Sequence, residues 1–147
     1  MAKIDVLLVL DTEDVFHPAE AGMDDVILHL ANILTEEECP GHFPIIARRA
    51  QQLQARGRSD IINAVRRHQV GVHTLTTEPP REIAMTARLD WNDGFQAVQK
   101  YETEAVQAVA ESFQTDPVCL SSHTFSSPPQ SIAVAGKMGL PFLYGEA

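Results

Sequence analysis

Three carboxylates in four positions follow the first apolar run of the chain. The run ends at Leu10, and Asp11, Glu13 and Asp14 lie directly after it. In α/β proteins, ligands bind at the carboxyl ends of the strands, where the loops carry the variable chemistry. Like charges at this density repel one another unless a cation, a shared proton or a basic partner relieves them. The cluster therefore predicts such a site, with a solvated loop that caps the next helix as the alternative.

A histidine lies at the end of another predicted strand. His73 closes an apolar run that contains Gly71, within residues 69–74. We expect the strands that carry Asp11 and His73 to be neighbours in a parallel sheet, so that both side chains reach one edge. Imidazole and carboxylate are common ligands of zinc and related divalent metals, and Glu78 in the next loop could add an oxygen ligand. A structural histidine is the alternative for His73.

Two further histidines are weaker candidates. His123 lies in a loop rich in serine and threonine, a composition found in sugar or phosphate sites and equally in ordinary turns. His17 is close enough in sequence to reach the first acidic cluster. The chain contains no nucleophile elbow, no phosphate-binding glycine loop and no HExxH motif.

Strands and helices alternate along the chain and must position these side chains. We predict strands at residues 4–10, 42–47, 69–74, 118–122 and 141–144. Helices are predicted at residues 24–38, 48–56 and 130–138, and after Ser59. A further long helix is predicted after Asp90, which caps it, with Trp91 as a candidate core residue. This order implies an α/β fold with parallel strands and a buried first strand. An incomplete (β/α) barrel is expected, with a five-stranded doubly wound sheet as the alternative.

Length and charge limit the possible functions. The 147 residues suit one domain, residues 1–147. A net charge of −9, from 20 acidic and 11 basic residues, argues against nucleic acid and anionic membranes as partners. No segment resembles a signal peptide or a membrane span, so a cytoplasmic location is expected. Cys39 and Cys119 match no metal-binding spacing and are expected to be free thiols.

Three stretches resemble the polysaccharide deacetylase family, the NodB-homology carbohydrate esterases. They are residues 9–14, residues 57–74 and residues 139–141, and the middle one is the most specific. The resemblance implies a distorted (β/α) barrel that removes an N-acetyl group from a sugar or hydrolyses a small amide with a divalent metal, zinc above all. It also implies that Asp11 is the base, and that Asp14 and His73 bind the metal.

The chain departs from the family at several motifs. Thr77 occupies the position of the second histidine ligand, and a threonine cannot replace an imidazole at zinc. The family's later arginine- and proline-bearing motif is not recognisable in residues 121–129, and its final motif would lie beyond Ala147. Glu78 or His123 would have to complete the ligand set, so any metal is expected to bind weakly. A non-catalytic relative with a carbohydrate-binding cleft is the alternative function.

An incomplete barrel leaves an edge strand without a neighbour. We expect that edge at Phe142, Leu143 and Tyr144, the last predicted strand. An apolar edge strand is a template for association with another chain. The sequence therefore predicts a homo-oligomer that acts on a small-molecule or carbohydrate substrate.

Overall fold

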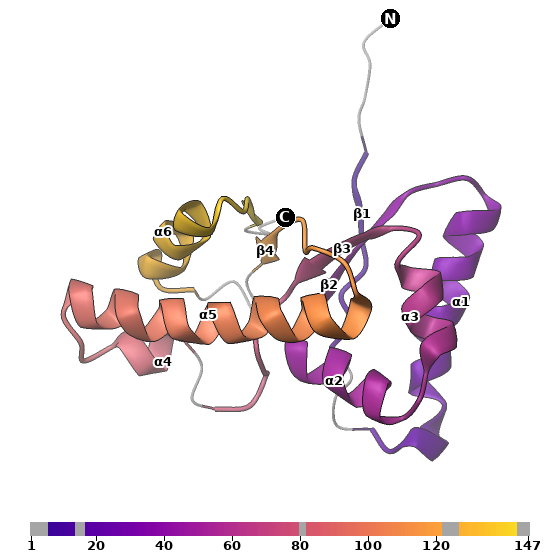
Figure 1. Cartoon of the computed structure of the whole chain (residues 1–147), viewed down its shortest axis with the longest axis horizontal. Coiled ribbons are helices and arrows are strands. Elements are labelled where there is room, and N and C mark those ends of the chain that lie inside the picture. The colour runs from indigo at the N-terminus through magenta and orange to yellow at the C-terminus, as the bar shows by residue number, and fades with distance from the viewer. Residues whose placement is uncertain (1–5, 14–16, 80–81, 122–126, 144–147) are drawn as a thin grey trace, which may run out of the picture.

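The computed structural model describes residues 6–13, 17–79, 82–121 and 127–143, and five parallel strands in them form one sheet (Figure 1). The strands are β1 (Leu8–Val9), β2 (Gly41–Ile45), β3 (Gln69–Val72), β4 (Leu120–Ser121) and β5 (Phe142–Leu143). They lie in the order β1-β2-β3-β4-β5, with Pro44 opposite Gly71 and Val72 opposite Leu120. A doubly wound sheet reverses its strand order at a switch point, whereas a barrel keeps the order of the chain. The observed order supports the barrel prediction and contradicts the doubly wound alternative.

Helices connect the strands and cover one side of the sheet. They are η1 (Ala19–Ala21), α1 (Met23–Glu36), α2 (Ala47–Ala55), α3 (Ser59–Val65), α4 (Glu82–Thr86), α5 (Trp91–Phe113) and α6 (Pro129–Met138). The Asp90 side chain accepts a hydrogen bond from the Asp93 backbone and starts α5, as predicted. Gly139, with φ of 72°, ends α6. Figure 1 shows α5 running across the strands. None of the described helices is long and apolar enough to cross a bilayer.

Alternation along the strands gives the sheet two different faces. The outer face is apolar and packs into the main hydrophobic core; its members are Phe43, Ile45, Val70, Val72 and Leu120. Buried residues of α2, α3 and α5 complete that core, among them Leu53, Ile61 and Phe113. The inner face carries the intervening residues His42, Gly71, His73, Cys119 and Ser121. The covered outer face therefore positions the polar side chains of the inner face.

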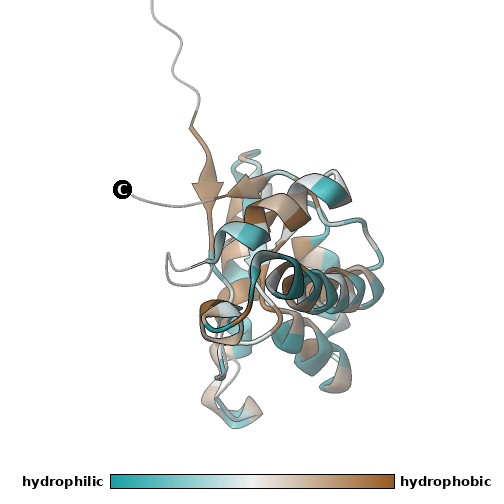
Figure 2. Cartoon of the chain, turned by 90° about the vertical axis from the view of Figure 1, so that its left-hand side faces the viewer, coloured by the Kyte–Doolittle hydropathy of each residue, from teal (hydrophilic) through white to brown (hydrophobic). Residues whose placement is uncertain are grey.

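The prediction of a buried first strand is wrong. Val6 is 76% exposed and Val9 is 48% exposed. In the described part of the chain β1 pairs only with β2, so it is an edge strand, and Figure 2 shows its apolar ribbon at the margin of the fold. Trp91 is exposed as well, because it is the first residue of α5 and burial along that helix begins at Gly94.

Candidate metal centre

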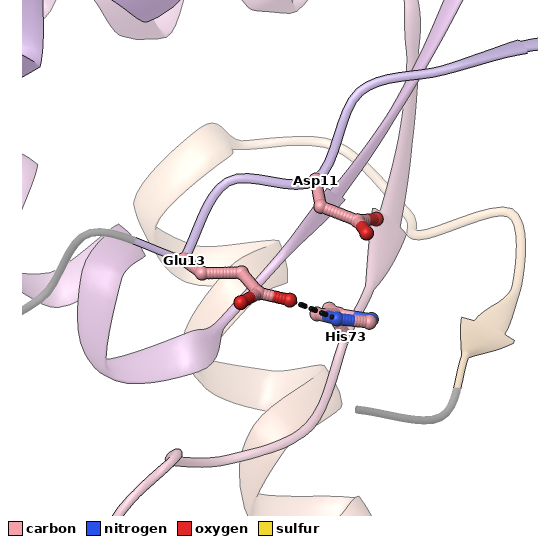
Figure 3. Close-up of side chains that lie close together, drawn as sticks. All are labelled: Asp11, Glu13 and His73. Atoms are coloured by element: carbon pink, nitrogen blue, oxygen red, sulfur yellow. Dashed lines mark hydrogen bonds and ion pairs between the residues drawn. The ribbon is translucent and has the colours of Figure 1, made fainter. Parts of the chain in front are cut away.

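Asp11, Glu13 and His73 converge at the carboxyl edge of the sheet (Figure 3). Each offers one ligand atom, and the three atoms lie within 4.8 Å of one another. Asp11 is exposed, Glu13 is partly buried, and His73 is 4% exposed. The group is thus open to solvent on the Asp11 side and enclosed on the His73 side.

Backbone alternation puts Asp11 and Glu13 on the same side of the first strand. Thr12 between them faces the other way and is buried, and its Oγ1 donates a 2.6 Å hydrogen bond to the Pro44 carbonyl. The Thr12 backbone N–H donates to the same carbonyl at 3.2 Å. Anchoring of Thr12 therefore fixes the direction of both carboxylates.

His73 is held at both ring nitrogens. Its Nδ1 lies 2.9 Å from Ser121 Oγ, and Ser121 donates its own hydroxyl hydrogen to the Val72 carbonyl at 3.1 Å. Ser121 Oγ therefore accepts from Nδ1–H, which directs Nε2 away from β4. Nε2 lies 2.7 Å from Glu13 Oε1. A hydrogen bond from the second ring nitrogen fixes the tautomer and ring direction of a histidine that binds a metal, and Ser121 supplies the acceptor here.

The strands that carry Asp11 and His73 are not neighbours, contrary to the sequence-based expectation. β2 lies between β1 and β3. These two strands are therefore about 10 Å apart, which is twice the spacing of adjacent strands. Side-chain length bridges this separation: Glu13 and His73 extend toward one another over β2 and meet. Asp11 and His73 therefore come together, although by a different route, with Glu13 as the third member, whereas the predicted place of Asp14 in this group stays a prediction.

Of the other sequence candidates, the structure describes Glu78 and His17, and neither belongs to this cluster. Asp14 and His123 lie outside the described residues. Glu78 is exposed, and its backbone N–H donates to Thr76 Oγ1 at 3.1 Å. His17 is exposed, and its carbonyl accepts a 2.8 Å hydrogen bond from Arg56. Ligand roles for Asp14 and Glu78 stay predictions.

Sequence reasoning counted Glu13 in the acidic cluster but gave it no ligand role, and it gave no role to Ser121. A signal for Glu13 was present, because residues two apart on an extended strand share a face, and Asp11 was already a candidate. No comparable signal exists for Ser121, whose contact with His73 joins residues that are 48 positions apart.

The donor set suits a divalent cation. An imidazole nitrogen and a carboxylate are ligands that zinc accepts in sites with open coordination positions, and a second carboxylate beside them can act as a base. A cation at this place would also relieve the repulsion between Asp11 and Glu13. Thr77, at the position of the second histidine in the deacetylase motif, has a buried Oγ1 with no hydrogen-bond partner among the described residues.

A second polar pair lies deeper on the inner face. His42 Nε2 is 3.2 Å from Cys119 Sγ, and both residues are buried. Burial lowers the pKa of His42, against an opposing effect of the Asp11 charge, and burial raises the pKa of the Cys119 thiol to about 11. The thiol is therefore protonated at neutral pH, as expected of a structural cysteine.

Neither a protein-family model nor a curated protein sequence matches the chain. Several solved structures do. A mutant of a CE4 family pseudoenzyme from Bacillus anthracis, with restored enzymatic activity, matches with a TM-score of 0.67 and 12% identity, over 92% of this chain and 42% of that chain. The family 4 carbohydrate esterase from Streptomyces lividans, in complex with acetate, matches with a TM-score of 0.63 and 17% identity, over 94% and 60%.

A family 4 acetyl xylan esterase from Clostridium thermocellum, in complex with a cobalt ion, also matches. Its TM-score is 0.58 at 12% identity, over 92% of this chain and 55% of that chain. These likenesses show that the chain has part of the fold of the CE4 carbohydrate esterases and polysaccharide deacetylases. The chain spans about two fifths of the length of the first of these structures.

Proposed function

We propose that the chain is a deacetylase-like protein of the CE4 type whose inner face binds a divalent metal, zinc by preference, and acts on an N-acetylated sugar or a small amide. The convergence of Asp11, Glu13 and His73 on one point carries this proposal. The cobalt-containing CE4 structure with the same fold supports it.

The residues divide into two roles in this proposal. Glu13 and His73 hold the cation, with Asp14 and Glu78 as further ligands predicted from the sequence. A bound cation supplies Lewis-acid polarisation of the carbonyl and lowers the pKa of water. Asp11, the exposed carboxylate, acts as general base: it takes a proton from water as the oxygen bonds to the carbonyl carbon. The same proton goes to the amine nitrogen as the carbon–nitrogen bond breaks.

A non-catalytic relative with a carbohydrate-binding cleft is the second candidate function. Thr77 favours it, because the second histidine of the deacetylase motif is absent. One of the solved structures that share the fold is itself described as a pseudoenzyme. The two candidates differ in whether acetate is released from an N-acetylated sugar.

Titration calorimetry with Zn²⁺ tests the metal site. We expect weak binding by the wild type and loss of binding in His73→Ala and Glu13→Gln. His29→Ala is the matched control, because His29 is an exposed histidine on α1 and should not matter. Sub-micromolar affinity that survives His73→Ala would show that the proposed ligands are wrong.

A gain-of-function variant sharpens the choice between the two functions. Thr77→His restores the imidazole at the position where the deacetylase motif has its second ligand. We expect Zn²⁺ affinity to rise at least about tenfold, since a third or fourth protein ligand completes the usual zinc set. Release of acetate from chitin oligosaccharides by this variant, and not by the wild type, would establish the wild type as the non-catalytic form. Release by the wild type itself would establish an active deacetylase.

The remaining sequence-based predictions belong to the same proposal. We propose a single domain over residues 1–147, a cytoplasmic location, and a small-molecule or carbohydrate partner. We also propose a homo-oligomer.

A further inference from the structure

The residue after His73 has an unusual backbone conformation. Thr74 has a φ of 116°, which lies in the region that favours glycine. Threonine is branched at Cβ, so this conformation is particularly unfavourable for it. Such a conformation persists only where the surroundings impose it, and it is concentrated at functional sites.

Hydrogen bonds to the Thr74 side chain hold this conformation. Thr74 Oγ1 donates a 2.6 Å hydrogen bond to Glu82 Oε1 on α4, which is short and charge-assisted. The Tyr101 hydroxyl on α5 also lies 3.3 Å from Thr74 Oγ1. Tyr101 also accepts from the Thr76 backbone N–H and donates to the Thr76 carbonyl, both at 3.3 Å. Thr74 is 3% exposed, and Glu82 and Tyr101 are buried.

Main-chain hydrogen bonds tie His73 to the end of β2 and Thr74 to the start of α2. The His73 N–H donates to the Ile45 carbonyl, and the Ala47 N–H donates to the Thr74 carbonyl, each at 2.9 Å. The backbone is thus fixed on the α2 side, and the Thr74 side chain is fixed on the α4 side. Both attachments act on Thr74, the residue that directly follows His73, so they bear on the direction of the His73 ring.

We propose that Glu82 is a positioning residue for His73: by accepting the Thr74 hydrogen bond, it imposes the backbone turn that aims the imidazole at Glu13. The inference rests on the proposed metal site, of which His73 is a ligand. Glu82 is not a member of the cluster of Asp11, Glu13 and His73, and it is assigned its role through Thr74.

The neighbouring acid supports this assignment. Glu102 on α5 is buried, and burial, followed by the charge on Glu82, raises the pKa of Glu102 to about 8. At neutral pH Glu102 therefore retains its proton. Glu82 is the member of the pair that accepts from the Thr74 hydroxyl.

The test is a double-mutant cycle with two readouts. Glu82→Ala removes the acceptor, Glu82→Gln keeps a neutral acceptor, and Thr74→Gly removes the need for one, because glycine adopts a positive φ freely. Glu102→Gln is the matched control, since it alters the same buried pair without touching Thr74. The readouts are the nitrogen chemical shifts of the His73 ring in metal-free protein, and Co²⁺ affinity with its visible absorption spectrum.

We expect Glu82→Ala to shift the His73 ring signals and to weaken Co²⁺ binding about 10- to 100-fold, the range found for residues that orient metal ligands. Glu82→Gln should recover most of both properties, Glu102→Gln should change neither, and Glu82→Ala should have no further effect in the Thr74→Gly background. Unchanged ring signals in Glu82→Ala, or an equal loss in the Thr74→Gly background, would overturn the inference. If the wild type binds no Co²⁺, the proposed function fails, and the ring signals of the metal-free variants still decide the positioning role.

Discussion

The two faces of the sheet are built from the same strands but from different chemistry. On the outer face, Phe43, Ile45 and Val72 are completely buried and belong to the hydrophobic core. On the inner face, His73 is nearly as buried as Val72 beside it, yet both of its ring nitrogens have polar partners. Burial alone therefore does not distinguish the residues that stabilise the fold from those that carry chemistry. The comparison predicts that stability and metal binding can be changed separately.

The largest effect is expected from truncation of the outer face. Phe43→Ala should lower the free energy of unfolding by about 3–5 kcal/mol, because it removes buried apolar surface and leaves a cavity. His73→Ala on the inner face should remove metal binding at a smaller loss of stability. Urea denaturation followed by circular dichroism measures the loss of stability in both variants, and Zn²⁺ titration calorimetry measures metal binding. A loss below about 1 kcal/mol for Phe43→Ala would mean that this face is not the main core.

The next prediction tests how closely the inner face is packed. A methyl group at Gly71 would lie 2.8 Å from Cys119 Sγ and 2.9 Å from His42 Nε2. Gly71→Ala should therefore destabilise the chain by about 1–3 kcal/mol through overpacking. Gly136→Ala is the control: nothing lies within 4 Å of its added methyl group, and alanine stabilises a helix by roughly 0.5–1 kcal/mol over glycine. If Gly71→Ala is as stable as the wild type, the His42–Cys119 contact is not rigid.

The order of the elements was predictable, because each strand and most helices show local periodicity and caps. Asp90 before α5 and Gly139 after α6 are examples that the structure confirms. The exposure of β1 was not predictable, because a short apolar run looks the same in a buried central strand and in an exposed edge strand. Its exposure follows from what pairs with it, which the local sequence does not encode. α4 was also missed: its five residues give too short a pattern to detect.

The candidate site was predicted in part. Asp11 and His73 were identified because strand ends converge in parallel sheets. Glu82 and Ser121 were missed, because their contacts with Thr74 and His73 depend on tertiary packing. The convergence of strand ends in parallel sheets explains which positions lie near one another. Side-chain length and loop conformation decide which of their atoms come into contact.

Glu102 is an exception to the apolar outer layer and predicts a pH-dependent stability. Its carboxyl keeps its proton up to about pH 8 in the folded chain, against an ordinary value of 4.5. Between these values the unfolded chain binds fewer protons than the folded chain, so stability falls as the pH rises. Glu102→Gln should remove this dependence and stabilise the chain at pH 8, because the mutant has no carboxyl that must lose its proton inside the fold.

Urea midpoints at pH 4.5 and pH 8 provide the measurement for Glu102→Gln, with little difference from the wild type expected at the lower pH. Glu104→Gln, on the exposed side of the same helix, is the control and should follow the wild type at both values. An equal slope in the wild type and Glu102→Gln would place the pH dependence elsewhere.

The smallest effect on stability, and the largest on association, is expected at the β1 flank. Val26, Leu30 and Ile33 are exposed and fall at helical spacing on α1, so they form one apolar stripe. The opposite flank of α1 carries Asp24, which forms ion pairs with Arg56 and Arg58 in the turn between α2 and α3. We expect the stripe to lie on the same flank of the molecule as β1, the first strand of the sheet in the described residues. Phe142 and Leu143 of β5 are only partly exposed, which moves the expected contact from the last strand to the first.

We expect two copies to associate through this flank, which would cover the edge of β1 and the α1 stripe together. Ile33→Lys and Val9→Lys should each shift sedimentation toward the monomer at tens of micromolar, while changing the free energy of unfolding by less than about 0.5 kcal/mol. Ile132→Lys is the control, because Ile132 is equally exposed but lies on α6. A monomeric wild type, or dissociation by Ile132→Lys as well, would show that this flank is not the contact. A dimer that only the two flank variants dissociate would show that a second copy covers the exposed first strand, whereas the outer face of the sheet is covered by the chain's own helices.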